Sequence, residues 1–243
     1  MIVLGFDTAT AATAVGLRLG DASTLQARDD PPPGARPGHA THLLPLAGEL
    51  LEQAGIGWER LERIAVGVGP GTFTGLRIGV ATARGLAQSL GIALVGVSSL
   101  RALAHAAFAQ AGEEVDGVIA VIDARRGEVF AAVYGKGAVD DPGAELLAPA
   151  VLAPGELAGL PARVGADELA ERWLAVGDGA VRFADQLHTP AILLPPDDSP
   201  LHRVSGEAVC ALSEALEPGD AQAVTPRYLR RPDAEIALLQ AHA

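Results

Sequence analysis

Two similar strand–turn–strand units constrain the fold of this chain more than any other feature. Apolar runs interrupted by short turns predict one β-hairpin over residues 2–19 and another over residues 118–134. The first strand of each unit ends in an aspartate, Asp7 in one and Asp123 in the other. The repetition indicates an α/β protein with two halves related by duplication. The four strands are expected at residues 2–7, 14–19, 118–123 and 128–134.

The rest of the pattern fits the same α/β organisation. Consecutive prolines make residues 29–38 a loop, because proline removes a backbone donor and disfavours helix before it. We expect a first lobe at 1–102, joined by part of the tail at about 220–243, and a second lobe at 103–219. Further helices are predicted at 43–54, 76–90, 98–108 and 205–216, and further strands at 64–68, 92–97 and 174–176.

Charge and cysteine content exclude several classes of protein. The net charge of −12 makes the chain a poor candidate for binding RNA or DNA on its own, since affinity for the phosphate backbone depends on Lys and Arg. A single cysteine, Cys210, leaves no disulfide framework. Because the N-terminus lacks signal-peptide features and no apolar run is long enough to span a bilayer, we expect a cytoplasmic protein with no membrane contact.

The stretch GVGPGTFTGLRIGVATARGLA, residues 67–87, joins a predicted strand to a predicted helix through a glycine-rich loop. A P-loop would need Gly-Lys-Ser or Gly-Lys-Thr where Gly75-Leu76-Arg77 stands, and the Rossmann spacing is exceeded by one residue. Either the glycines form only a tight turn, or the helix start attracts an anion. Residues that could then lie near a nucleotide or anion are Asp7, Thr8, Thr10, Gly69, Gly71, Thr72 and Thr74.

The helix after this loop carries small residues on one apolar stripe. Gly79 and Ala83 lie four residues apart and share a face with Leu76. Glycine inside a helix costs about 1 kcal/mol relative to alanine, so its presence calls for a reason. The stripe either packs on the protein's own sheet or accepts a helix from a partner. The residues alone leave both interpretations open.

Five segments together resemble the bacterial TsaB family, also called YeaZ. They are GFDTAT at 5–10, HATHLLP at 39–45, IAVGVGPGTFTGLRIGVATARGLA at 64–87, DARRGEVF at 123–130 and PRYLR at 226–230. The resemblance extends from residue 2 to about residue 230, and the glycine-rich segment is its most specific part. Thr72 stands where the family usually has serine, which keeps the hydroxyl group. The resemblance implies the actin, Hsp70 and sugar-kinase (ASKHA) fold, with two RNase H-like lobes.

The resemblance also implies a role in tRNA modification. TsaB-like chains are required partners of TsaD, the subunit that transfers a threonylcarbamoyl group to the adenosine beside the tRNA anticodon (t6A). An ATPase, TsaE, joins them, and a TsaB-like chain alone forms a homodimer through the same surface. This implies no cofactor on the chain alone, ATP and Mg²⁺ only in the complex, and tRNA contact only through it. The interface candidates are His39, His42, Leu43, Leu46, Leu50, Leu76, Gly79, Val80, Ala83, Leu86 and Leu90.

Candidate catalytic groups are scarce in the sequence. TsaD-like enzymes hold a metal through His-x-x-x-His and an aspartate, whereas His39 and His42 here are three residues apart. We expect His39 to be exposed at a helix start, and with no third ligand we predict no metal site. Asp123 is followed by Arg125 and Arg126, so pairing with an arginine is at least as well supported as a phosphate role. No catalytic residue is predicted.

Two functional hypotheses remain. The first is a non-catalytic scaffold that activates a TsaD-like subunit. The second is an ATP-binding ATPase or phosphotransferase active on its own, which would bind nucleotide in isolation and lose it on Asp7→Ala. The tail segment 225–230 is expected to pack across the lobes rather than to offer Arg227, Arg230 and Arg231 as a basic spot for a partner or tRNA.

Overall fold

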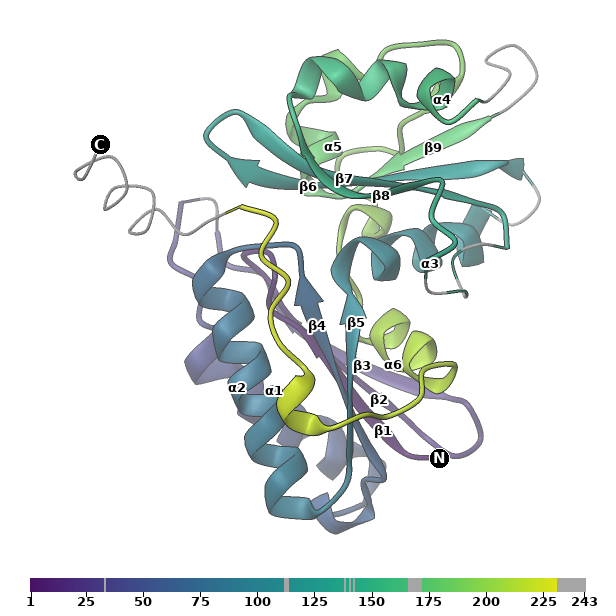
Figure 1. Ribbon diagram of the computed structural model, residues 1–243. Coiled ribbons are helices and arrows are strands. Elements are labelled where there is room, and N and C mark those ends of the chain that lie inside the picture. Colours follow the sequence, from purple (N-terminus) through teal and green to yellow (C-terminus); the bar gives the residue numbers. More distant parts are fainter. Residues whose placement is uncertain are drawn as a thin grey trace.

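The computed structural model describes residues 1–32, 34–111, 114–137, 139, 141, 143–165 and 172–230. It contains two five-stranded sheets with the same strand order, β3-β2-β1-β4-β5 and β8-β7-β6-β9-β10. In each sheet the first three strands in sequence are antiparallel neighbours, and the fourth runs parallel to the first. Two RNase H-like lobes, the expected ASKHA fold, are thereby confirmed (Figure 1).

The strands lie close to the predicted positions, with three additions. Strands β3, β8 and β10 fall in segments for which no strand was predicted. The first sheet consists of β1 (Val3–Asp7), β2 (Thr13–Arg18), β3 (Thr24–Asp29), β4 (Arg63–Gly69) and β5 (Ala93–Ser98). The second consists of β6 (Gly117–Arg125), β7 (Glu128–Gly135), β8 (Leu147–Leu152), β9 (Trp173–Val176) and β10 (Ile192–Leu193).

The helices cover both faces of the first sheet and fill the space between the sheets. Helices α1 and α2 lie on one face of the first sheet, α6 lies on the other, and α3 lies between the two sheets (Figure 1). The α-helices are α1 (His39–Ala54), α2 (Phe73–Leu90), α3 (Ser99–Ala111), α4 (Leu160–Arg163), α5 (Asp178–Arg182) and α6 (Gly206–Glu214). Short 3-10 helices are η1 (Trp58–Arg60), η3 (Pro154–Gly159), η4 (Ala184–Gln186), η5 (Pro200–His202) and η6 (Ala221–Ala223).

Helices α3 and α6 join the lobes into one core. Val97 of the first sheet, Leu103 of α3 and Ile122 of the second sheet belong to the same buried apolar cluster. The expected lobe boundary at residue 102 falls inside α3, and α6, expected in the second lobe, packs on β1 and β2 of the first. The lobe limits stay an interpretation, and residues 231–243 of the expected tail lie outside the described part of the chain.

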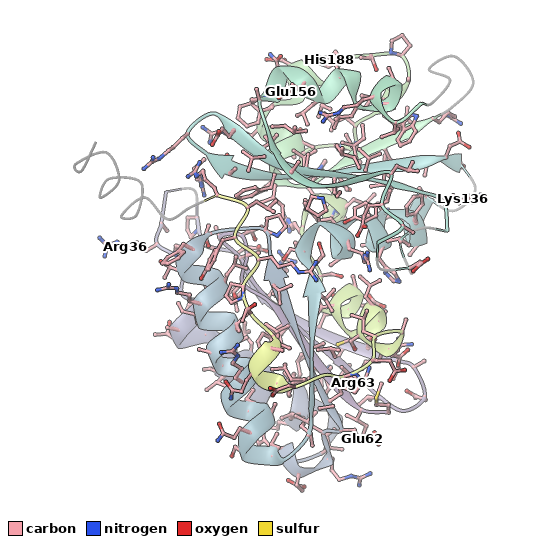
Figure 2. The ribbon with its side chains drawn as sticks, viewed as in Figure 1. Arg36, Glu62, Arg63, Lys136, Glu156 and His188 are labelled. Atoms are coloured by element: carbon pink, nitrogen blue, oxygen red, sulfur yellow. The ribbon has the colours of Figure 1, made fainter. Side chains whose placement is uncertain are left out.

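Helix α6 approaches its sheet at backbone distance because glycines face one another. A Cβ atom at Gly16 would overlap the backbone of Gly206, and one at Gly5 would lie 2.6 Å from Cys210 Sγ. At the other end of α6, the Arg63 guanidinium donates to the carbonyl oxygens of Ser213 and Leu216 (Figure 2). A cation at a helix C-terminus also interacts favourably with the helix dipole. Among the described residues, none of the helices has the length and hydrophobicity that crossing a bilayer requires.

Gly16→Ala should destabilise the protein by about 1–3 kcal/mol or more, because α6 must move away from β2 to admit a methyl group. Gly48→Ala is the matched control, since a Cβ atom on Gly48 of α1 meets nothing within 4 Å. That change should stabilise the protein by about 0.5–1 kcal/mol through helix propensity. Urea unfolding of both variants measures the difference. Equal free energies of unfolding would contradict the packing described here.

Candidate functional site

The glycine-rich loop between β4 and α2 packs directly on the turn between β1 and β2. A side chain at Gly71 would overlap the Ala9 carbonyl group, and one at Gly75 would overlap the Thr8 carbonyl oxygen. The Thr72 N–H donates to Ala9 O at 2.7 Å, and Thr8 Oγ1 donates to Gly75 O at 2.8 Å. The glycines therefore serve contact between two backbone segments, and the room that they leave is filled by the protein's own hairpin turn.

Asp7 is enclosed where β1, β4 and α3 meet. Its side chain is buried, with the residue 1% exposed. Oδ1 accepts the Ala9 N–H at 2.7 Å and Oδ2 accepts the Ser99 hydroxyl at 2.5 Å. Gly67 faces the same carboxylate, and a side chain at Gly67 would overlap Oδ2. Burial raises the pKa of Asp7, and the hydrogen bonds from Ser99 and Ala9 offset only part of that effect.

Asp123, the matching residue of the second lobe, is paired with arginines. Its Oδ1 accepts the Arg125 N–H at 2.8 Å, and its Oδ2 lies 3.3 Å from Arg125 Nη1 and 3.5 Å from Arg182 Nη1. Pairing with arginines, one of the roles that the sequence left open for Asp123, is therefore present in the structure. The Asp123 N–H donates to Asp178 Oδ1 at 3.0 Å, and burial raises the pKa of Asp178.

The second lobe repeats the packing of the glycine loop. Its segment Gly177–Ala180 follows β9, which runs parallel to β6 as β4 runs parallel to β1. A side chain at Gly177 would overlap the Val121 carbonyl oxygen, and one at Gly179 would lie 2.9 Å from the Asp123 nitrogen. In both lobes, glycines after the parallel strand hold the next helix against the strand that carries the aspartate or the turn that follows it.

The two histidines of α1 point in different directions. His39 is 2% exposed, so the expectation that it lies exposed at the helix start is wrong. Its Nδ1 lies 2.9 Å from Thr13 Oγ1, and the missing side chain of Gly75 leaves room for its ring. Burial lowers the pKa of His39, which keeps the ring neutral at pH 7. His42 is exposed and lies 2.8 Å from Asp29 Oδ2.

No set of three or more His, Cys, Asp or Glu side chains within the described ranges is arranged to hold a metal ion. His39 and His42 therefore form no metal-binding pair with a third ligand there. Of the other nucleotide-proximal candidates, Gly69 adopts φ of +98° at the turn, Thr10 is half-buried and Thr74 is exposed.

The small-residue stripe of α2 faces the protein's own sheet. Leu76 and Ala83 are fully buried, and a side chain at Gly79 would overlap Thr8 Oγ1. The interpretation that this stripe meets a partner is therefore wrong, because the β1–β2 turn and β4 already cover it. Other interface candidates that lie in the core are His39, Leu43, Leu50 and Val80, whereas His42, Leu46, Leu86 and Leu90 reach the surface.

The outward faces of α1 and α2 carry a different set of residues. Leu44 of α1 is 47% exposed, although it is a large apolar side chain. On α2, the exposed residues include Arg77, Ala81 and Gly85. A side chain at Gly85 would meet no atom within 4 Å, so this glycine is not explained by packing inside the described structure.

Residues 221–230 form a segment, here called the C-terminal strap, that runs along α2 to the second lobe (Figure 1). Arg84 of α2 donates to the Gln222 carbonyl oxygen at 2.5 Å. Tyr228 stacks on Phe73 with ring centroids 5.0 Å apart, and its hydroxyl group accepts from Arg77 at 3.1 Å. Arg84 also donates to the Val224 carbonyl oxygen, and the Arg227 N–H donates to the Val68 carbonyl oxygen. Farther along, the Arg230 guanidinium donates to the carboxylate of Glu128 in β7. The expectation that this segment packs across the lobes is confirmed up to residue 230, and Arg231 lies outside the described residues.

Comparison with known proteins agrees with this architecture. The family model described as TsaD, tRNA N6-adenosine threonylcarbamoyltransferase, matches residues 31–189. The solved structure of YeaZ from Pseudomonas aeruginosa superposes with a TM-score of 0.75 at 30% identity, covering 94% of this chain and 99% of that one. The chain belongs to the TsaB family, also called YeaZ.

Relatives of the TsaB family match this chain over different lengths. The tRNA threonylcarbamoyladenosine biosynthesis protein TsaB of Escherichia coli K12 is 37% identical over 134 residues, which is 55% of each chain. TsaB of Haemophilus influenzae is 34% identical over 52% of its length. The matched segment thus spans about half the length of these two relatives. An uncharacterized protein of Mycobacterium tuberculosis H37Rv is 33% identical over 96% of this chain and 93% of its own.

Ala83→Glu should destabilise the protein by about 3–5 kcal/mol or prevent folding, because it buries an unpaired carboxylate under β4. Ala81→Glu, two residues away on the exposed face, should change the free energy of unfolding by no more than about 0.5 kcal/mol. Circular dichroism during thermal unfolding separates the two. A stable, folded Ala83→Glu monomer would show that the stripe faces outward after all.

Asp7→Asn should become more stable than the wild type as the pH rises. The raised pKa means that the folded protein binds this proton more tightly than the unfolded chain, so stability is lost as the pH passes through the folded pKa. Asparagine stays neutral and avoids this loss. Urea unfolding between pH 4 and pH 8 (about the range in which carboxyl groups of this kind ionise) should show a difference that grows with pH.

Asp21→Asn provides the control for this measurement. Asp21 is fully exposed and its pKa is lowered by hydrogen bonds from Ser23, so its substitution should give no gain in stability with rising pH. A difference between Asp7→Asn and the wild type that stays constant across the pH range would contradict the raised pKa of Asp7.

Proposed function

We propose that this chain is a non-catalytic subunit in t6A biosynthesis, which supports threonylcarbamoyl transfer by docking on a TsaD-like catalytic subunit. The observation that carries the proposal is the internal use of both strand-end carboxylates. Asp7 accepts hydrogen bonds from Ser99 and Ala9 inside the core, and Asp123 is paired with two arginines. The names of the TsaB relatives support the pathway.

A nucleotide site of its own would need features that these contacts oppose. Phosphate groups bind with metal ions held by accessible carboxylates and with free backbone N–H groups. Here the Thr72 N–H is already bonded to Ala9 O, and Asp7 is enclosed. These contacts favour a scaffold over an ATPase or phosphotransferase acting alone. ATP and Mg²⁺, where used, would belong to the assembled complex.

We propose that the docking surface is the outward face of α1 and α2, because the small-residue stripe of α2 is buried against the protein's own sheet. Leu44 offers exposed apolar area there, and Ala81 and Gly85 let a partner backbone approach closely. The same face would serve a homodimer when the partner is absent. A TsaE-like ATPase would then join the complex in the cytoplasm. Transfer RNA would bind through the complex rather than to this chain directly, because the net charge of −12 disfavours direct tRNA binding.

Gly85→Arg should abolish complex formation with the TsaD-like subunit while leaving the fold intact. The new side chain enters open space and should add about 0.5–1 kcal/mol of stability through helix propensity. Size-exclusion chromatography of the mixed subunits measures binding, and nucleoside analysis of modified tRNA measures t6A formation.

Gly159→Arg is the matched control, since Gly159 of the second lobe is exposed and also has nothing within 4 Å of a Cβ atom. It should bind the partner and support t6A formation as the wild type does. Wild-type behaviour of Gly85→Arg would overturn the docking face. Threonylcarbamoyl transfer by the wild-type chain without any partner would overturn the non-catalytic role.

A further inference from the structure

A cavity of about 370 Å³ lies where the C-terminal strap passes the end of α6 and strand β5. This volume lies within the usual range of about 300–1,000 Å³ for small-molecule pockets. The second lobe contributes the segment 143–149, so the cavity borders both lobes. Its charged and hydroxyl-bearing lining residues are Ser98, Arg101, Glu145 and Arg227.

Arg101 is a buried cation beside this cavity. The residue is 7% exposed, and its Nη2 is paired with the Glu145 carboxylate. Its Nε–H has no hydrogen-bond partner among the described residues. Arg101 also lines the cavity, so this cation adjoins the space that a ligand would occupy.

Arg227 supplies a second guanidinium group from the strap. Its backbone N–H donates to Val68 O at 2.8 Å, and the contacts of Arg84 and Tyr228 hold the strap on either side. The side chain of Arg227 is exposed and makes no ion pair within the described part of the chain. The backbone is therefore fixed while the charge stays available.

A larger cavity of about 800 Å³ between β2, β3, α3 and α6 is a weaker candidate despite its three arginines. Arg18 is paired with Glu214 at 2.9 Å, and Arg28 and Arg203 both face Asp30, at 2.7 and 3.7 Å. These charges are already balanced by carboxylates of the same surface, whereas the smaller cavity sets two arginines against one glutamate.

We propose that the smaller cavity binds a small anion bearing a carboxylate or phosphate group, held between Arg101 and Arg227. Planar guanidinium groups bind such oxyanions through paired hydrogen bonds. Glu145 would repel a second negative charge on its side, so it limits the ligand to one anionic group placed toward Arg227. The bound anion would connect the strap with segment 143–149 of the second lobe. This inference does not rest on the proposed function.

Titration of the ¹⁵N-labelled wild-type chain with inorganic phosphate, and separately with acetate, at constant ionic strength tests the site. Saturable NMR shifts are expected at Ser98, Arg101 and Arg227, and the tighter of the two probes identifies the preferred group. Arg227→Ala should weaken binding by about tenfold to a hundredfold, the loss expected for a charged hydrogen-bond donor. Arg227→Lys keeps the charge but loses the planar, paired donors of the guanidinium group. Its affinity for the anion should therefore lie between that of Arg227→Ala and that of the wild type.

Arg36→Ala removes the same charge from an exposed loop away from the cavity and should bind as the wild type does (Figure 2). Several results would overturn the site. The first is the absence of saturable shifts up to about 10 mM of either anion. Equal affinity of Arg227→Ala and the wild type, or a loss of affinity in Arg36→Ala as large as that in Arg227→Ala, would also contradict it. Shifts that map elsewhere in the wild type would overturn it without any variant.

Discussion

Backbone contact at glycine residues is the constraint on which both lobes depend. In the first lobe, Gly71 and Gly75 bring the loop before α2 onto the carbonyl groups of the β1–β2 turn. In the second, Gly177 and Gly179 do the same on β6. A methyl group at these positions would overlap backbone atoms of the neighbouring segment. That segment could make room only by moving its backbone and breaking hydrogen bonds, because the interior is closely packed. The two lobes thus share a packing device as well as a strand order.

This device determines what the strand-end aspartates can do. Packing the loop on the turn encloses Asp7, whose carboxylate then needs donors from within the chain and obtains them from Ser99 and Ala9. In the second lobe, Asp123 stays nearer the surface and is neutralised by Arg125 and Arg182. The two carboxylates thus find their partners within the chain in two different ways.

Periodicity in the sequence predicted the elements well, but it could not say which side of a helix is covered. The spacing of Leu76, Gly79 and Ala83 shows correctly that they share a face. Ala81 and Gly85 form another small-residue face of the same helix, and the contacts of α2 with β4 and with Thr8, far away in sequence, determine which face is buried. Helical spacing is a local signal, whereas burial is set by tertiary contacts.

Two other wrong or missing predictions, for His39 and for β3, also depend on tertiary contacts that local sequence does not contain. His39 follows Pro37 and Gly38, which indicated an exposed helix start, yet Gly75 leaves the space that its ring occupies. Strand β3 was not predicted because its residues are mixed in polarity and half-buried at a sheet edge, without a clear alternation. Pairing with β2 supplies the backbone hydrogen bonds of β3 and so stabilises a strand that its own sequence does not predict.

The arginines of α2 show how a cation can be used without a ligand. Arg77 and Arg84 lie seven residues apart on one side of the helix, a spacing that would suit an anion at the glycine loop. Both are directed to the strap instead, Arg84 to backbone carbonyl oxygens and Arg77 to Tyr228. A carbonyl oxygen carries only a partial charge, so these contacts fix the position of the strap without neutralising a carboxylate. The strap on which Arg227 stands is thus anchored on the first lobe by Arg84 and Arg77, and farther along on the second lobe, where Arg230 pairs with Glu128.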